Sequence, residues 1–257
     1  MTAHDRALAW DGCHNVRDLG GLPTENGGRI ASGALVRGDN ARRLSDEAWR
    51  AVVEHGVRTV VDLRFPEELA ADPPRDLPVN AVHVSVLGRA DPQYAEELDA
   101  RLVGLPDEVA HTREAYLEFL ERNRAAFGRA VSVVATAPPG GVLMHCMEGK
   151  DRTGLVIALL LRLAGVPPEE IAADYALSAE RLAPVFAPWL DAATDDAQRE
   201  RRRRIASTPA AGMVEVLQEL DRRYGGVEGY LREGGVSEEE LRAARKRLRE
   251  QAADAAA

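Results

Sequence analysis

The sequence predicts an α/β protein with a central, mostly parallel sheet flanked by helices and with helical additions in its C-terminal third. Short β-branched or apolar runs of strand length occur at residues 57–63, 81–86 and 142–145. Residues 92–128 have helical periodicity, and the chain beyond Pro167 has the pattern of consecutive helices. Strands that alternate with helices are typical of a layered α/β sheet. We treat residues 1–257 as a single domain.

The first helix has clear signals at both ends. Ser45 is a predicted N-cap, and Leu44 and Trp49 have the spacing of a hydrophobic staple. Gly56 is expected to end the helix. Residues 57–63 follow directly and are predicted to form a strand, because their valines and threonine favour an extended backbone.

Proline and glycine mark the boundaries of the later elements. The proline-rich stretch 71–78 is a predicted loop, and residues 135–141 form a second break. Between these breaks lie the second strand and the helical segment 92–128.

The next predicted helix, residues 153–164, is apolar nearly all round and should be buried. Gly165 and Pro167 are expected to stop it. Ser237 begins the last helix with a capping-box pattern.

Composition excludes several classes of function. With 33 basic and 42 acidic residues, the net charge of −9 does not suit a general nucleic-acid binder, although it is compatible with a small positive pocket. Two cysteines are too few for a disulfide framework or a four-cysteine zinc site, so we expect a reduced, cytoplasmic protein. The first twenty residues lack the apolar segment of a secretory signal. The longest apolar run, 155–161, is too short to span a bilayer, so we expect no transmembrane segment.

The clearest chemistry lies in residues 142–154, VLMHCMEGKDRTG. Cys146 follows the predicted strand, Arg152 opens the predicted helix, and Gly149 lies between them. Such a loop points backbone N–H groups at an anion, and the helix dipole adds partial positive charge. Arg152 can donate to two phosphate oxygens, and the same field favours the Cys146 thiolate. The pattern predicts attack by Cys146 on a bound phosphorus.

Other loop chemistries fit less well. A nucleotide-binding P-loop would need glycine at Met144 and serine or threonine at Asp151. A zinc site would need more ligands than His145 and Cys146 provide. A sulfurtransferase also places a single cysteine in such a loop, but the pairing with Arg152 favours phosphate chemistry.

Residues 145–154, HCMEGKDRTG, strongly resemble the signature loop of cysteine-based protein tyrosine phosphatases. More narrowly, they are similar to the bacterial tyrosine and phosphoinositide phosphatases with the loop HCxxGKDRTG. Residues 15–21, NVRDLGG, resemble that family's NFRDLGG motif, and residues 58–64 with Glu67 resemble its next motif. Residues 224–231 also have the family's character. The resemblance covers most of the chain and implies the tyrosine phosphatase fold.

By this resemblance Cys146 is the nucleophile and Arg152 is the phosphate clamp. The implied phosphate-binding residues are Met147, Glu148, Gly149, Lys150, Asp151, Arg152 and Thr153. Thr153 can hydrogen-bond the sulfur, and His145 is expected to orient the loop. Three polar residues of the N-terminal motif are candidates for lining or bracing the pocket: Asn15, Arg17 and Asp18.

The general acid is open between two aspartates. A leaving oxygen needs a proton from a group within hydrogen-bond reach. The resemblance favours Asp151, although the flanking Lys150 and Arg152 favour its ionised form. The alternative is Asp62, which we expect at the carboxyl end of the strand 57–63, where ligands of open α/β sheets bind. Arg64 beside it is a candidate second phosphate contact.

Several features bear on the substrate. Lys150 is one of only two lysines in a chain with 31 arginines, and the resemblance implies a role for it in phosphoinositide recognition. Glu148 stands where the family commonly has a small residue, and its carboxylate repels highly anionic substrates. The arginines of residues 199–204, including Arg201–Arg204, form either a solvated face or a contact for phosphate-rich substrates. They lie in a helical segment, about 175–210, that is a candidate lid.

We therefore predict a metal-independent phosphomonoesterase that works through a phosphocysteine and needs no cofactor. The expected substrate is a phosphorylated protein, with tyrosine or dual specificity, or a phosphoinositide. A phosphatase of small-molecule esters and a catalytically silent phosphate-binding module are the alternatives. The sequence leaves the oligomeric state open.

Overall fold

The computed structural model describes residues 6–73 and 79–249. Five strands form one sheet in the order β1–β2–β5–β3–β4. Their bounds are β1 Arg17–Asp18, β2 Leu35–Gly38, β3 Val57–Asp62, β4 Asn80–His83 and β5 Gly141–His145. The short β1 pairs antiparallel with β2, and the other neighbouring pairs are parallel. The predicted fold class, an α/β protein with a mostly parallel sheet, is confirmed.

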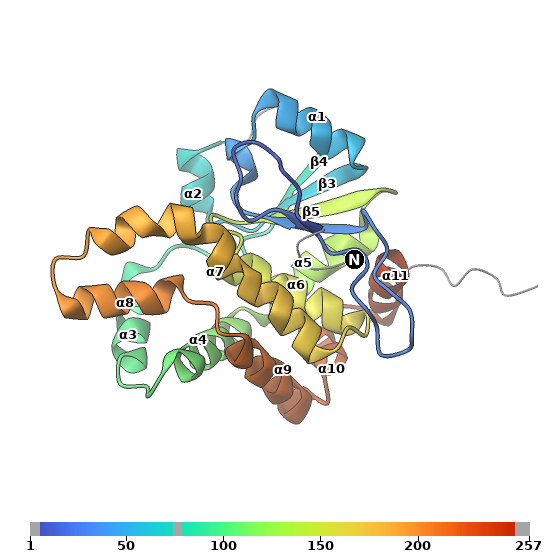
Figure 1. Ribbon diagram of the computed structural model, residues 1–257. Coiled ribbons are helices and arrows are strands. Elements are labelled where there is room, and N and C mark those ends of the chain that lie inside the picture. The colour runs from blue at the N-terminus through green and yellow to red at the C-terminus, as the bar shows by residue number, and fades with distance from the viewer. Residues whose placement is uncertain (1–5, 74–78, 250–257) are drawn as a thin grey trace, which may run out of the picture.

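Helices lie on both faces of this sheet (Figure 1). Before β5 they are α1 Asp46–Glu54, α2 Pro66–Ala71, α3 Pro92–Leu102, α4 Glu108–Arg122 and α5 Arg124–Thr136, with a short 3-10 helix at Ala41–Arg43. After β5 they are α6 Asp151–Leu163, α7 Pro168–Asp191, α8 Asp196–Ala206, α9 Ala210–Tyr224, α10 Val227–Glu233 and α11 Glu238–Leu248. The helical C-terminal third is therefore present as predicted. Residues 74–78 of the predicted loop 71–78 lie outside the described part of the chain.

The strands alternate between two hydrophobic layers. On β3, Val60 packs in the smaller cluster with Trp49 of α1, whereas Val61 belongs to the larger cluster with Leu155 of α6. Successive side chains of a strand point to opposite faces, so each central strand contributes to both layers. Figure 1 shows α1 on one side of the sheet and most of the remaining helices on the other.

The predicted end signals act as expected. The Ser45 hydroxyl accepts a hydrogen bond from the backbone N–H of Ala48 at 3.2 Å, and Leu44 and Trp49 are buried together. Gly56 ends the helical turn with a φ of 95°. The capping box of Ser237 with Glu240 is also formed.

Some predicted boundaries were wrong. The second strand ends at His83 rather than residue 86, although the N–H of Val84 still donates to Asp62 of β3 at 2.9 Å. Gly128 lies inside α5, and the helical segment breaks instead at Asn123. The helix after the phosphate loop begins at Asp151, two residues earlier than predicted. Packing within the large core overrides local propensity at these points.

The fold brings four strand ends to one edge. Gly38, Asp62 and His83 align through the parallel register with His145, the last residue of β5. Open α/β sheets place their ligands outside this carboxyl edge. Within the described residues, none of the helices is long and apolar enough to cross a membrane.

Candidate active site

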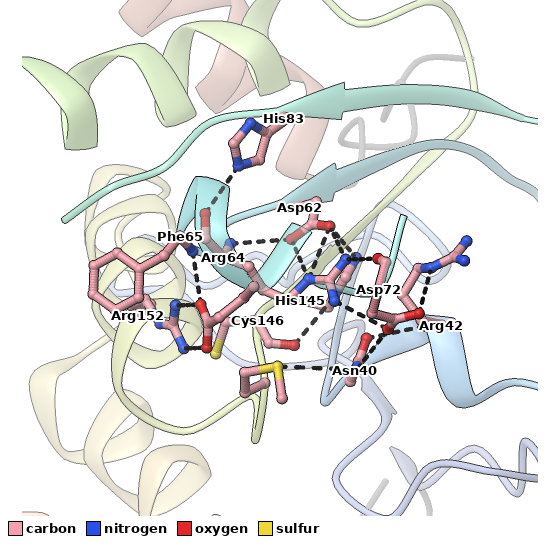
Figure 2. A network of polar contacts seen from close by, with 12 residues as sticks. Asn40, Arg42, Asp62, Arg64, Phe65, Asp72, His83, His145, Cys146 and Arg152 are labelled. Atoms are coloured by element: carbon pink, nitrogen blue, oxygen red, sulfur yellow. Dashed lines mark hydrogen bonds and ion pairs between the residues drawn. The ribbon is translucent and has the colours of Figure 1, made fainter. Parts of the chain in front are cut away.

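The predicted phosphate loop joins the end of β5 to the start of α6 at this carboxyl edge. Cys146 directly follows His145 and is only 2% exposed. Arg152 lies in the first turn of α6, and Figure 2 shows its guanidinium close to Cys146. The nucleophile and the arginine predicted from the sequence are thus together, at the positive end of a buried helix.

Gly149 allows the loop to turn tightly against β2. Its φ is 66°, and a Cβ at this position would lie 2.3 Å from the carbonyl oxygen of Gly38. The carbonyl of Gly149 accepts hydrogen bonds from Arg37 at 2.6 Å and Asn15 at 3.2 Å. Asn15 also donates to the carbonyl of Glu148 at 3.0 Å. These contacts hold two carbonyls of the loop against Asn15 and Arg37, so neither carbonyl is directed at a bound anion.

A buried charge cluster holds these bracing residues. Asp174 of α7 accepts hydrogen bonds from Arg6 at 3.0 Å, Arg17 at 2.9 Å and Arg37 at 2.8 Å. Arg17 also donates to the side chain of Asn15 at 2.6 Å. Burial would raise the pKa of Asp174, but Arg17 and Arg37 hold it well below its usual value. Arg17 is fully buried, and its bonds to Asn15 and Asp174 brace the loop.

Asp18, the third polar residue of the N-terminal motif, also braces backbone. Its carboxylate accepts from the N–H groups of Gly20 and Gly33, each at 2.8 Å, and from the ring of His55 at 3.1 Å. These contacts fix the turn between β1 and β2.

The Arg152 side chain is held by two neighbours. Both terminal nitrogens donate to the carboxylate of Glu68, one at 3.1 Å, and the guanidinium lies 4.8 Å from the ring centroid of Phe65. Burial acts to lower the pKa of Arg152, but the negative charge of Cys146 and the Glu68 pair raise it above its usual value. Glu67, the acidic residue singled out in the sequence, instead pairs with Arg89 at 2.6 Å.

Asp151 lies at the start of α6 in a hydrogen-bonded chain of hydroxyls. Tyr116 donates to its carboxylate at 2.6 Å, and the Tyr116 and Tyr175 hydroxyls are 2.7 Å apart. Burial and the Asp151 charge raise the pKa of Tyr116 well above its usual value, so this hydroxyl stays a donor. The Asp151 side chain is 40% exposed.

Lys150 reaches across to the helix α8. Its ammonium donates to the carbonyls of Ile205 and Ser207, the latter at 3.3 Å, and lies 3.2 Å from the Asp151 carboxylate. Carbonyls at a helix C-terminus carry partial negative charge, so they suit a lysine ammonium.

Asp62, the alternative acid, is engaged with Arg64 (Figure 2). The Arg64 guanidinium donates to both of its oxygens, with the shortest contact at 2.8 Å, and also reaches Asp72 at 3.2 Å. Burial acts to raise the pKa of Asp62, but the bonds from Arg64 and the charge of His145 lower it. Arg64 is fully buried and paired with two carboxylates, and its role as a second phosphate contact stays a prediction.

Three further predicted residues line or support the loop. The Nδ1 atom of His145 is 3.2 Å from the carbonyl oxygen of Cys146, and its Nε2 atom is 3.8 Å from the Asp62 carboxylate. The hydroxyl of Thr153 is buried and has no hydrogen-bond partner in the structure. Burial and the nearby Asp151 carboxylate raise the pKa of Glu148.

A cavity of about 500 Å³ adjoins the loop on the side of α3, α4 and α8. Lys150, Asp151 and Arg152 of the loop and the first turn of α6 are among its lining residues. Of the predicted arginine run, Arg201 and Arg204 also line it. Cavities of this size can bury most of a small ligand.

The described residues hold no cluster of three or more histidine, cysteine, aspartate or glutamate side chains that could bind a metal ion. The prediction of a metal-independent reaction stays a prediction.

Sequence reasoning missed several residues of this site. Three of them contact the loop or its arginine from distant segments: Glu68, Tyr116 and Arg37. Asp174 contacts the loop only indirectly, because it accepts a hydrogen bond from Arg37. Only Glu68 had a local signal, since it directly follows Glu67 in the second family-like motif.

Comparison with known proteins gives consistent matches. Residues 8–250 match the model of a tyrosine phosphatase family. A tyrosine-protein phosphatase from Nostoc commune is 33% identical, over 85% of this chain and 75% of the relative. The triple specificity protein phosphatase PtpB from Mycobacterium tuberculosis is 28% identical, over 88% of this chain and 93% of its own. A putative tyrosine-protein phosphatase from Cupriavidus necator is 31% identical, over 90% of this chain and 84% of the relative.

Proposed function

The chain belongs to the tyrosine phosphatase family, and we propose that it hydrolyses phosphate monoesters through a phosphocysteine formed on Cys146. The juxtaposition that carries this proposal is a buried cysteine beside Arg152 at the N-terminus of α6. In the first step the Cys146 thiolate attacks phosphorus while the loop N–H groups and Arg152 stabilise the equatorial oxygens. Water then hydrolyses the S–P bond and releases phosphate.

Two features suit a nucleophilic sulfur at Cys146. The unpartnered hydroxyl of Thr153 is available to donate to the sulfur. The helix N-terminus and the Arg152 guanidinium place positive charge beside the loop, which suits a bound phosphate.

We assign the general acid to Asp151 rather than to Asp62. Asp151 lines the cavity and its side chain is 40% exposed, so a leaving oxygen can reach it. Asp62 has a lowered pKa and is committed to Arg64, so it is a poor proton donor at neutral pH. Tyr116 donates to the Asp151 carboxylate, which stabilises the charge that develops as the proton leaves.

This assignment is tested by changing each aspartate and the leaving group. With Asp151→Asn we expect turnover of phenyl phosphate, whose leaving group is poor, to fall by about 10²–10⁴. Turnover of p-nitrophenyl phosphate should fall much less, because its leaving group needs little protonation. If neutral-pH turnover survives Asp151→Asn but collapses in Asp62→Asn, the acid is Asp62.

For the substrate, we propose tyrosine-phosphorylated protein or a phosphoinositide as the first candidates. A small-molecule ester is the second candidate, because the largely apolar surface of the cavity disfavours a highly anionic substrate. A panel of phosphotyrosine peptide, phosphoinositide and nucleoside phosphates, compared by kcat/KM, separates these classes.

The same panel tests catalysis itself. Cys146→Ser should abolish turnover and keep vanadate or phosphate binding. A wild-type protein with no vanadate-sensitive turnover on any member would instead be a silent phosphate-binding module.

We also propose that α8 and the end of α7 form a lid. The two helices form a hairpin whose second arm lies beside α3 (Figure 1), and Arg201 of α8 pairs with Asp99 of α3 at 2.8 Å. Lys150 ties the phosphate loop to the end of α8.

A further inference from the structure

The cavity beside the phosphate loop is mostly apolar. It lies between α3 and α4 on one side and α8 with the following connection on the other. The apolar side chains that line it include Phe65, Leu87, Leu98, Leu102, Ala115 and Phe119. A phosphate and one aromatic ring would leave much of its 500 Å³ unfilled.

An apolar side chain lies beside the predicted phosphate clamp. Asp151 and Arg152 line the cavity directly, and the ring centroid of Phe65, another lining residue, is 4.8 Å from the Arg152 guanidinium. The group attached to the leaving oxygen would therefore enter a cavity whose surface is mostly apolar. In a phosphoinositide, by contrast, a polar and charged inositol ring is bonded to that oxygen.

The charged residues at the cavity rim have partners. Arg89 pairs with Glu67 at 2.6 Å, Arg122 with Asp91 at 3.7 Å, and Arg201 with Asp99 at 2.8 Å. Arg204 likewise lies 3.3 Å from Glu200. A second phosphate group would have to compete with these carboxylates. The rim thus suits a substrate with a single phosphate and an uncharged remainder.

We propose that the substrate is a phosphate monoester of a single flexible apolar chain, with the chain bound in this cavity. The inference rests on the phosphocysteine chemistry of the proposed function and, among the substrate classes named there, it selects the small-molecule ester. The Cys146 sulfur forms a bond to phosphorus as the ester P–O bond breaks, and Asp151 gives its proton to the departing alkoxide. The chain leaves as an alcohol, and water then cleaves the S–P bond to give phosphate and the free thiol.

The first test is the rate of the wild-type protein on n-alkyl phosphates from ethyl to octyl. Each methylene buried in the cavity should raise kcat/KM by about threefold to fourfold until the cavity is full. Equal kcat/KM along the series overturns the proposal.

The second test narrows the cavity without touching the loop. Leu102→Trp adds a ring to the apolar lining of the cavity, whereas Val103→Trp places the same ring on the adjacent residue, which is 59% exposed and outside the cavity lining. In each variant kcat/KM for every alkyl ester is divided by kcat/KM for p-nitrophenyl phosphate. We expect the chain-length dependence of this ratio to disappear in Leu102→Trp and to persist in Val103→Trp. If Leu102→Trp fails to fold, Ala95→Trp, at the exposed edge of the same cavity, replaces it.

The outcomes separate this inference from the function on which it rests. If the wild-type protein shows no turnover that depends on Cys146, the phosphatase assignment itself is refuted. Normal turnover of p-nitrophenyl phosphate without chain-length dependence would refute only the apolar-chain substrate. If Leu102→Trp instead lowers kcat/KM for phosphotyrosine peptides with apolar flanking residues, the cavity binds a peptide side chain and the proposal is wrong.

Discussion

Replacing Asp174 with asparagine removes the carboxylate that three buried arginines share. Arg6, Arg17 and Arg37 are at most 5% exposed, and each donates to Asp174 at 2.8–3.0 Å. Arg17 already shows the excess of positive charge, because burial and the neighbouring Arg37 lower its pKa to about 9 despite Asp174. Without the carboxylate, three buried cations would lie together with no compensating charge.

The expected cost is large because one partner of a buried ion pair is removed while the others stay. Such changes destabilise by about 3–5 kcal/mol. For a chain of this size the corresponding decrease in Tm is about 6–20 °C, at roughly 2–4 °C per kcal/mol. Because Arg37 and Arg17 also fix Gly149 and Asn15, vanadate binding should weaken in the folded variant as well.

The control is Asp196→Asn, the same substitution at a residue that is 99% exposed and pairs with Arg199 on the surface of α8. Exposed pairs contribute about 0–1 kcal/mol, so Tm should change by no more than a few degrees. Thermal unfolding followed by circular dichroism, with vanadate titration of both variants, measures the two effects. A decrease in Tm for Asp174→Asn no larger than that of the control would refute the reasoning.

The Asp174 carboxylate also predicts that the stability of the protein depends on pH in the acid range. Its pKa is lower in the folded protein than the value of about 3.9 expected in the unfolded chain, so its stabilisation is complete above that value and is lost as the pH falls toward the folded pKa. Between pH 5 and pH 3 the wild-type Tm should therefore fall more steeply than that of Asp174→Asn. Parallel curves would contradict this.

Two further substitutions test the loop and its contact with α8. Gly149→Ala should abolish turnover, because a Cβ would lie 2.3 Å from a backbone oxygen. The control is Gly225→Ala, where φ is 69° and the space around the residue is open, so it should cost only about 1 kcal/mol of stability and leave turnover intact. Comparable kcat/KM in the two variants would refute the steric argument. Lys150→Met removes the ammonium that binds the carbonyls at the end of α8, so amide hydrogen exchange of α8 should accelerate. Lys246→Met, at the other lysine and exposed on α11, should leave it unchanged.

Local signals sufficed for most elements and for the centre of the candidate site. The N-cap Ser45, the strand 57–62 and the strand–loop–helix around Cys146 depend on neighbours in sequence, so the pattern of residues predicts them. The end of β4 at His83 and the continuation of α5 through Gly128 depend on pairing and packing with distant segments, which no local pattern records.

The sequence by itself determined the fold class, the family resemblance and the cysteine–arginine loop, because backbone propensity and a contiguous motif specify them. Only the tertiary structure decided what surrounds that loop. It showed that Asp62 is bound to Arg64, that Glu68 holds Arg152, and that a cavity lined by both apolar and charged side chains adjoins Asp151. These facts depend on which distant side chains converge at one sheet edge, and convergence is a property of the packed chain.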